Sequence, residues 1–219
     1  MAAKDDGPDA ILVALFCLLI RWCVSLEGYS GRRAPPMFGD YEAQRHWMEI
    51  TFHLPVGDWY RDTPSNNLQY WGLDYPPLTA YVSYVCGAVC QWLEPASVAL
   101  GTSHGYESET HKALMRFTVL VLDALVFFPA TFWLSKHLRS SANKATVAGL
   151  VLLQPSLILI DHGHFQYNCV SLGLACGAAA ALLEGRDVAA SVLFCLSLNF
   201  KQMSLYYAPG GPFLITLFR

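Results

Sequence analysis

Six apolar segments, separated by polar stretches, constrain the fold of this chain more than any other feature. The chain is 54% hydrophobic and only 14% charged, whereas about a quarter of the residues in a soluble domain are charged. The pattern predicts an all-α, polytopic membrane protein. The segments are Ala10–Leu26, Leu78–Leu93, Phe117–Leu134, Ala145–Ile160, Cys169–Leu183 and Val188–Phe200, followed by a seventh at Pro212–Phe218.

These segments divide the chain into four parts. We predict a cytoplasmic tail over residues 1–9, a transmembrane helix over 10–26, a large non-cytoplasmic loop over 27–116 and a transmembrane helix bundle over 117–219. Most segments are shorter than the roughly 20 residues that a spanning helix needs. Flanking aromatic residues or local thinning of the bilayer must therefore help them to span.

The charge pattern sets the expected orientation. The linker Ser135–Lys144 contains three Lys or Arg residues and no acid, which predicts a cytoplasmic position. Glu27–Pro77 has four basic and seven acidic residues and should lie on the other side. Two apolar segments separate these stretches, but the number of crossings between them must be odd. We therefore interpret Leu78–Leu93 as an interfacial or re-entrant helix, although Arg32 and Arg33 weaken this charge argument.

Other features exclude several classes of protein. The net charge of −3, with no basic run, argues against a nucleic-acid partner. The seven cysteines lie in or beside apolar segments without a C-x-x-C pair, which predicts free thiols and neither disulfides nor a zinc site. The first apolar segment has no basic region before it and no clear cleavage site, so we interpret it as a retained anchor.

The polar loop contains a predicted helix that begins near Tyr41. Its length should be about four turns, and its apolar residues recur at helical spacing, as in a helix that lies on a bilayer surface. Asp40 precedes it and has two compatible roles: an N-cap, or a rigidly held general base whose charged form the helix dipole favours. The apolar residues are Ala43, Trp47, Ile50 and Leu54, with Glu42, Arg45, His46, Glu49 and His53 facing elsewhere.

A second carboxylate, Asp74, lies later in the same loop, before Tyr75-Pro76-Pro77. Proline is favoured in the first turn of a helix, so Asp74 is a candidate cap for the next helix. The neighbouring Tyr70 and Trp71 are the type of side chain that stacks against sugar rings. Two acids at helix starts, both flanked by aromatics, favour a functional role in sugar binding.

Asp161–Asn168 is predicted to be a polar break between two apolar segments. His162, His164, Gln166 and Asn168 are candidates to line a pocket, and helix capping is the alternative. Two histidines without a third nearby ligand are weak evidence for zinc, so no metal is predicted.

Within the apolar segments, four features have structural interpretations. Asp123 is predicted to make a polar contact between helices, with Arg116 on the same helical face, and Arg21 to pair within the bundle or to reach the interface. Gly173 and Gly177 form a G-x-x-x-G pattern, which indicates close helix packing. Lys201 is either a lysine at the membrane border, which we favour, or a contact for a lipid phosphate.

Four of these motifs together resemble one family, the endoplasmic-reticulum glucosyltransferases that use dolichyl-phosphate glucose, of the glycosyltransferase C superfamily. The resemblance runs from about Leu26 to Pro209 and is greatest to members that add the first glucose to Man9GlcNAc2. The motifs are Gly39–Trp47, Gln69–Tyr81, Gly105–Ser108 and Asp161–Asn168.

The resemblance implies a fold and an activity. The fold is a transmembrane helix bundle with a luminal loop that contains amphipathic helices. The activity is an inverting α-1,3-glucosyl transfer at the luminal face of the endoplasmic-reticulum membrane, without metal or other cofactor. The partners are the dolichol-linked donor and the acceptor Man9GlcNAc2-PP-dolichol. The family's general base matches Asp40, and its second acidic position matches Asp74. The predicted substrate-binding residues are Glu42, Arg45, His46, Trp71, Tyr75, His162, His164, Gln166 and Asn168.

The chain also departs from the family. Members are about twice as long, and Gly210-Gly211-Pro212 interrupts an expected apolar helix. These departures suggest a truncated form. The alternative to an enzyme is therefore a non-catalytic membrane fragment or isoform that keeps only acceptor binding or assembly. The sequence leaves the oligomeric state open.

Overall fold

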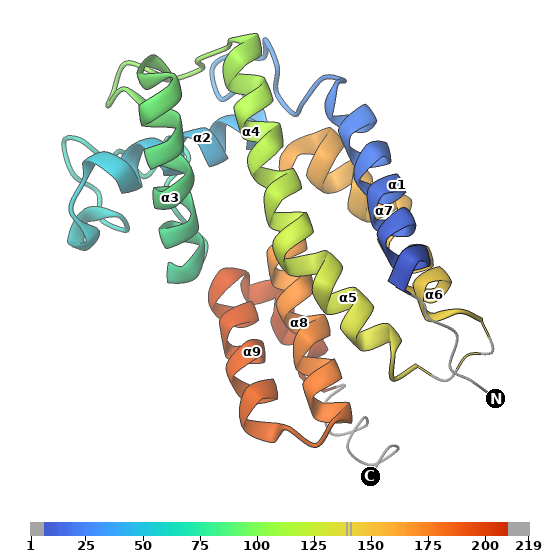
Figure 1. Cartoon of the computed structure of the whole chain (residues 1–219). Coiled ribbons are helices and arrows are strands. Elements are labelled where there is room, and N and C mark those ends of the chain that lie inside the picture. Colours follow the sequence, from blue (N-terminus) through green and yellow to red (C-terminus); the bar gives the residue numbers. More distant parts are fainter. Residues whose placement is uncertain (1–6, 139, 141, 210–219) are drawn as a thin grey trace.

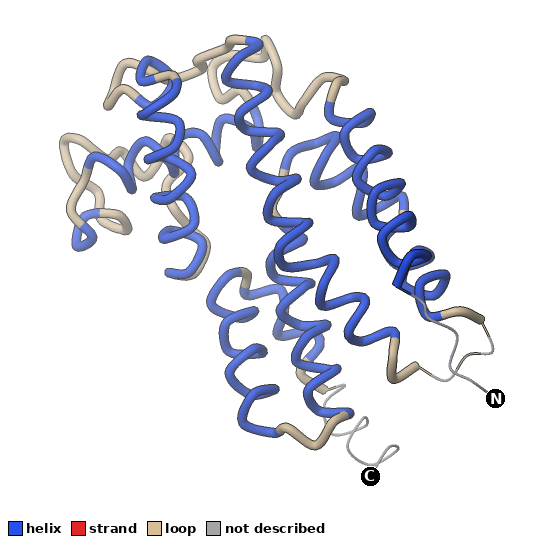
Figure 2. Tube along the Cα trace, viewed as in Figure 1, coloured by secondary structure: helices blue, strands red, loops and turns tan. Residues whose placement is uncertain are grey.

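The computed structural model describes residues 7–138, 140 and 142–209, and within them it contains helices and loops but no strand (Figure 2). The predicted all-α class is confirmed. The predicted segment Pro212–Phe218 and most of the tail 1–9 lie outside the described residues. The α-helices are α1 (Gly7–Ser25), α2 (Gly39–His53), α3 (Pro77–Leu93), α4 (Glu109–Leu122), α5 (Phe128–Ser135), α6 (Lys144–Leu152), α7 (Pro155–Ile158), α8 (Asn168–Leu183) and α9 (Asp187–Phe200). Shorter turns are η1 (Val56–Asp58), η2 (Pro95–Val98) and η5 (Gln202–Tyr207), which are 3-10 helices, and η3 (Asp123–Phe127) and η4 (Leu159–Phe165), which are π-helical.

A continuous rod made of α4, η3 and α5 runs through the middle of the molecule (Figure 1). On one side of it α1 packs against α6, and on the other side α2 packs against α3. α8 contacts the rod at η3 and α5, at the end away from α2, and α9 packs against α8 and α3. The elements that contain the predicted functional loop are therefore gathered around one end of the rod.

The rod, Glu109–Ser135, is 27 residues long and is apolar enough to cross a membrane. α6 and Pro155–Phe165 meet the same test together, but they are bent by 51°. α8 and α9 are apolar but shorter. The described residues thus contain one candidate span, or two if the bent pair counts as one. The number of crossings and the interfacial position of α3 stay predictions.

Two predicted segments differ from the structure around Pro155. Ala145–Ile160 was expected to be one helix, but it is broken between α6 and α7. Proline has no N–H to continue the helical ladder, and it disfavours helical backbone in the residue before it. The predicted polar break at Asp161–Asn168 is also wrong in part, because helical structure continues through η4 to Phe165.

The surroundings of α2 differ from the prediction. Its 15 residues give the expected length of about four turns, but Tyr41 to Thr51 are buried on every face, polar residues included. α3, η2 and η4 pack around it. At Gly87 of α3, a Cβ atom would lie 2.6 Å from the carbonyl oxygen of Met48, so this contact requires glycine. α2 is therefore enclosed by protein and does not lie on a surface.

The predicted contacts of Asp123 and Arg21 within the bundle are confirmed, with one change of partner, whereas the position of Lys201 at a membrane border stays a prediction. Asp123 Oδ2 lies 2.5 Å from Arg21 Nε and 2.7 Å from His162 Nε2. Arg116 instead donates to the carbonyl groups of Gly28 and Gly163. At Gly173 an added Cβ would lie 2.8 Å from Phe127 Cα, which confirms the predicted close packing. All seven cysteines are free, as expected.

Candidate active site

Asp40 lies in the first turn of α2, where the chain enters the helix through an unusual backbone. Phe38 and Gly39 have positive φ angles of 55° and 69°, and the backbone of Gly31 lies so close to Gly39 that a Cβ there would be 2.8 Å from Gly31 N. Ser30 Oγ accepts the Asp40 N–H at 3.3 Å. No side chain caps α2 at its N-cap residue, Phe38. The interpretation of Asp40 as the cap is therefore wrong, and its carboxylate is available for other contacts.

Two side chains from a distant part of the sequence contact that carboxylate. Gln166 Nε2 donates to Asp40 Oδ2 at 2.7 Å, and His164 Nε2 lies 2.9 Å from the same oxygen. Phe165, between them, has a φ of 98°. The side chains of Asp40 and His164 are 37% and 44% exposed, whereas Gln166 is almost fully buried. The result is a carboxylate held on one oxygen and open to solvent on its other side.

The segment that supplies His164 and Gln166 is itself fixed at several points. The carbonyl oxygen of His164 accepts a hydrogen bond from Ser30 N, and the carbonyl oxygen of Gly163 accepts one from Arg116 Nη2. Asp161 accepts the backbone N–H groups of Asn168 and Cys169 at the start of α8. Because hydrogen bonds that involve a charged group are stronger than neutral ones, these contacts fix η4 to α4, to the start of α8 and to the loop before α2.

Asp74, the second predicted catalytic carboxylate, is exposed, and no described residue donates a hydrogen bond to it. It does not cap α3, whose N-cap residue is Pro76 without a side-chain bond. Burial and the nearby charge of Asp74 raise the pKa of Tyr60 to about 12. Tyr60 in turn donates to the carbonyl oxygen of Tyr75 at 2.8 Å. Asp74 therefore lies free at the surface, beside two tyrosines.

Trp71 and Tyr75 are brought to the start of α2 by hydrogen bonds and ring contacts. Trp71 Nε1 donates to the carbonyl oxygen of Met37 at 2.5 Å, and Trp47 Nε1 donates to the carbonyl oxygen of Trp71 at 2.8 Å. The rings of Trp47 and Tyr75 are 5.0 Å apart. Both predicted aromatics are partly buried. Two sequence motifs that were predicted separately thus meet at this end of α2.

Glu42, Arg45 and His46 form a buried network beneath the site. Arg45 donates to both oxygens of Glu42 and to Glu49, and all three residues are at most 1% exposed. Tyr70 also donates to Glu42, and Ser103 to Glu49. The network therefore joins α2 to both loops around it. Direct sugar contacts by Glu42, Arg45 and His46 stay a prediction. Glu42 and Arg45 are paired with each other, and His46 Nδ1 lies 3.3 Å from Glu49, whereas the buried Nε2 of His46 has no hydrogen-bond partner among the described residues.

His46, Glu49 and His104 are the three side chains, among the described residues, that could approach one metal ion, with ligand atoms within 4.8 Å of one another. The carboxylate of Glu49 already accepts hydrogen bonds from Arg45, Ser103 and Gly101 N. Burial alone would raise the pKa of Glu49, but the hydrogen bond from His46, the charge of Arg45 and the Gly101 amide lower it to about 2. These contacts explain the cluster without a cation.

His162 and Asn168 lie apart from Asp40. His162 is fully buried and contacts Asp123, so its prediction as a pocket residue is wrong. His162 contacts Asp123, whereas His164 contacts Asp40. The two histidines of the His-x-His pattern therefore do not converge on one metal site. Asn168 Nδ2 donates to Asp161, and its Oδ1 accepts from Lys201 Nζ at 2.7 Å. For Lys201 the sequence left open a membrane-border position or a lipid-phosphate contact, and it gave no signal for the role of Ser30.

Known proteins are similar in sequence to this chain over almost its whole length. A model of the ALG6, ALG8 glycosyltransferase family matches residues 17–219. A "probable dolichyl pyrophosphate Man9GlcNAc2 alpha-1,3-glucosyltransferase" of Arabidopsis thaliana is 57% identical over 213 residues, which cover 94% of this chain and 40% of the relative. The "dolichyl pyrophosphate Man9GlcNAc2 alpha-1,3-glucosyltransferase" of Pongo abelii is 53% identical over 199 residues, 90% of this chain and 39% of the relative.

A third relative, the "probable dolichyl pyrophosphate Man9GlcNAc2 alpha-1,3-glucosyltransferase" of Schizosaccharomyces pombe, is 48% identical over 197 residues, 88% of this chain and 38% of the relative. The chain thus spans about 40% of the length of the curated relatives that it matches. The resemblance inferred from the four motifs is confirmed. With a family model that matches from residue 17 to residue 219, this chain belongs to the ALG6, ALG8 glycosyltransferase family.

Proposed function

We propose that this chain forms the part of a glucosyltransferase that contains the catalytic base, Asp40. The reaction is the transfer of the first glucose from dolichyl-phosphate glucose to Man9GlcNAc2-PP-dolichol, at the luminal face of the endoplasmic-reticulum membrane. The observation that carries the proposal is the geometry of Asp40. Its carboxylate is fixed by His164 and Gln166 at 2.9 and 2.7 Å but stays partly open to solvent.

Asp40 would act on the hydroxyl group of the acceptor mannose. As the carboxylate takes the hydroxyl proton, the oxygen attacks the anomeric carbon of glucose, a new C–O bond forms, and the bond from that carbon to the phosphate oxygen breaks. Dolichyl phosphate leaves with the electron pair. Attack from the face opposite the phosphate inverts a β-linked donor to an α-linked product. Because phosphate leaves as a stable anion, the reaction needs no paired general acid.

The contacts of Asp40 suit a base. Hydrogen bonds from Gln166 and His164 use one oxygen, Oδ2, and fix the orientation of the carboxylate. The other oxygen is left to meet the acceptor hydroxyl. Asp74, exposed and beside Tyr60 and Tyr75, is proposed to orient the sugar. Metal is not required in this mechanism, since the phosphate is already a good leaving group.

The test uses the full-length protein in cells that lack first-glucose transfer, with lipid-linked glycans as the readout. Asp40→Asn keeps the shape of the side chain but removes the base, and it should lower transfer by roughly 10²–10⁴-fold. Asp74→Asn is the matched variant and should lower transfer less. Normal glucosylation by the Asp40→Asn protein would show that Asp40 is not the base. Expression of the 219-residue chain alone separates an active enzyme from the non-catalytic alternative.

A further inference from the structure

A buried cluster of ionisable side chains lies behind the candidate active site and takes no part in the proposed reaction. Asp123 Oδ2 lies 2.5 Å from Arg21 Nε and 2.7 Å from His162 Nε2, and the three side chains are at most 2% exposed. They come from the middle of the rod, from α1 and from η4. Buried charges cost free energy even where they are paired, so an acid at this depth of an apolar helix indicates a function.

The bond between Asp123 and His162 joins the π-helical turns η3 and η4. Asp123 begins η3, and His162 lies within η4. A π-helical turn is rare, and it occurs often at functional sites. In η4, His162 contacts the rod, whereas His164, two residues later, contacts Asp40. The same short turn is therefore anchored to the rod on one side and holds the carboxylate of Asp40 on the other.

The backbone at the end of this turn is strained. Phe165, the residue before Gln166, has a φ of 98°, which is uncommon for a residue with a bulky side chain. Such a conformation persists only where the surrounding contacts hold it. The ring of Phe165 is fully buried against the rings of Tyr41 and Tyr167. His162 adds a side-chain bond to the rod three residues before the strained position.

We infer that Asp123 is a positioning residue for the glucosyl transfer and that it acts through His162 and η4. Its bond to His162 fixes the turn so that His164 and Gln166 meet the carboxylate of Asp40. This role rests on the proposed function, in which Asp40 is the base. A base must lie within hydrogen-bond reach of the proton that it takes, and a misplacement of about 1 Å can lower a rate by about 100-fold.

A purely structural role is the alternative. Asp123 would then only neutralise Arg21, and His162 would only fill the space between η4 and the rod. Loss of His162 would lower the stability of the protein and leave the kcat of the folded fraction unchanged. The positioning role instead predicts a lower kcat in protein that is folded.

The test measures initial rates of glucose transfer by the purified full-length protein, with dolichyl-phosphate glucose as donor. His162→Leu removes the bond to Asp123, and Arg21 still pairs with that carboxylate, so no buried charge is left alone. The kcat per folded protein should fall by about 10–100-fold, with little change in the KM for the acceptor. His162→Gln keeps a side-chain donor and should regain most of the kcat.

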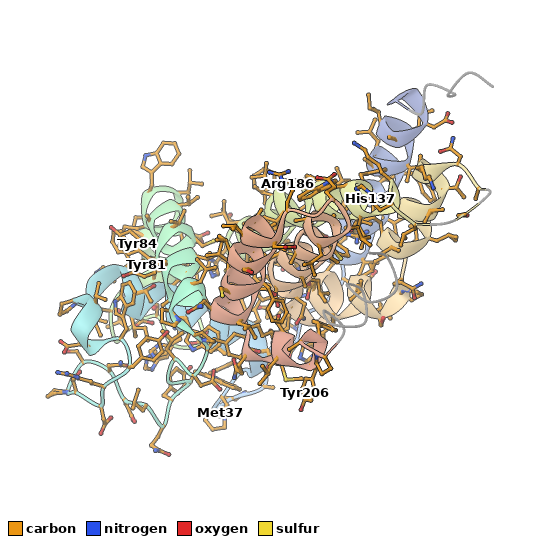
Figure 3. The ribbon with its side chains drawn as sticks, turned by 90° about the horizontal axis from the view of Figure 1, so that it is seen from below. Met37, Tyr81, Tyr84, His137, Arg186 and Tyr206 are labelled. Atoms are coloured by element: carbon orange, nitrogen blue, oxygen red, sulfur yellow. The ribbon has the colours of Figure 1, made fainter. Side chains whose placement is uncertain are left out.

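His137→Leu is the matched control. His137 also contacts a carboxylate, that of Glu184 at 3.1 Å, but it lies far from the candidate active site. Figure 3 shows His137 and Arg186 on one edge of the molecule and Met37, just before α2, on the opposite edge. This variant should have the kcat of the unaltered protein. An equal loss of kcat in the His162→Leu and His137→Leu proteins would overturn the inference.

A double-mutant cycle tests whether the effect passes through η4. Gln166→Leu already removes one contact through which η4 holds Asp40. His162→Leu should therefore lower kcat less in the Gln166→Leu protein than in the unaltered protein, because the two changes act on one network. Losses of kcat that simply multiply would overturn the inference, as would a normal kcat of the folded His162→Leu protein.

Hydrogen–deuterium exchange separates a failure of this inference from a failure of the proposed function. The backbone amides of η4 should exchange faster in the His162→Leu protein, because local opening becomes easier, whereas those of α9 should not. Unchanged exchange in η4 would show that His162 does not hold the turn. If Asp40→Asn keeps its transfer activity, the proposed base is wrong, and the exchange rates still report whether His162 anchors η4.

Discussion

At the residue scale, the reactivity of Asp40 depends on two donors that are far away in the sequence. Gln166 is almost fully buried and its amide can only donate through Nε2, so it holds one carboxylate oxygen in place. His164 is more exposed and contacts the same oxygen. A base must lie within hydrogen-bond reach of the proton that it takes. Gln166 is therefore expected to set the position of the carboxylate.

Gln166→Leu in the full-length protein should lower kcat for glucose transfer by about 10–100-fold, because it removes one hydrogen bond to a charged group, worth about 1.5–3 kcal/mol. KM for the acceptor should change little. Gln154→Leu, an exposed glutamine at the break before α7, is the matched control and should have normal kinetics. The measurement is initial-rate kinetics with dolichyl-phosphate glucose. An unchanged kcat for Gln166→Leu would contradict this role.

Because of Glu49, the free energy of unfolding should decrease as the pH falls into the acid range. Its pKa is lowered from 4.5 to about 2, so ionised Glu49 stabilises the folded state at neutral pH, by about 3 kcal/mol. That contribution is complete above pH 4.5 and is lost as the pH falls toward 2. Glu49→Gln should therefore lower the Tm at pH 7, and the difference from the unaltered protein should shrink between pH 4.5 and pH 2.

Thermal unfolding of the two full-length proteins in detergent, at a series of pH values, measures this difference. Glu27→Gln, at an exposed position after α1, serves as the control and should show no pH-dependent difference. A gap in Tm that stays constant down to pH 2 would mean that the network does not hold Glu49 in its charged form.

Sequence reasoning identified Asp40, His164 and Gln166 separately, but it could not pair them. The pairing depends on how η4 folds back over α2, and contacts between distant segments leave no local pattern. His162 shows the limit most clearly. Its polar neighbours suggested a pocket, yet the π-helical turn directs His162 toward Asp123 and His164 toward Asp40. In a loop without helical structure, the side chains of His162 and His164 could have faced the same pocket, as expected from the sequence.

At the element scale, α2 shows why hydrophobic periodicity alone misplaced a helix. The spacing of Ala43, Trp47 and Ile50 gave the correct length but implied that the opposite face meets water. That face is covered by Ser97, Ser103 and Tyr70, which satisfy its charged groups. Buried charges are tolerated where they are paired and hydrogen-bonded. The pattern of charges could have indicated this, since Arg45 lies one helical turn from both Glu42 and Glu49.

The contact of α8 with η3 requires glycine at position 173. Gly173→Ala would place a Cβ 2.8 Å from Phe127 Cα, where backbone has to move, and overpacking of this kind costs about 1–3 kcal/mol. At Gly177, one turn later, the same change meets only side chains at ordinary contact distances, with Leu193 the nearest at 3.4 Å. Gly177→Ala should be neutral or slightly stabilising, because alanine favours helix over glycine by about 1 kcal/mol.

Chemical or thermal unfolding of the two full-length variants in detergent compares them directly. We expect the Gly173→Ala protein to be the least stable, and the Gly177→Ala protein to be at least as stable as the unaltered protein. Equal stability of the two variants would mean that α8 and η3 do not pack as closely as the structure shows. The G-x-x-x-G pattern predicted close packing but could not distinguish its two glycines, because only the structure gives the neighbour of each.

At the scale of the whole molecule, the rod Glu109–Ser135 separates the candidate active site from the basic linker. Its 27 residues correspond to about 40 Å of helix at roughly 1.5 Å per residue, more than the ~30 Å hydrocarbon core of a bilayer. Figure 1 shows the loop between α3 and α4 at one end of the rod and the linker before α6 at the other. Glu184, in the turn between α8 and α9, contacts His137 of the linker at 3.1 Å.

This arrangement predicts that Thr102 and Lys136, both exposed, lie on opposite sides of the membrane. In a full-length protein without its native cysteines, Thr102→Cys and Lys136→Cys can be labelled in intact microsomes with a membrane-impermeant maleimide. Lys136→Cys should react at once, because basic linkers favour the cytoplasmic side. Thr102→Cys should react only after the vesicles are permeabilised. Labelling of both positions in intact vesicles would place Asp40 on the cytoplasmic side, away from a luminal acceptor.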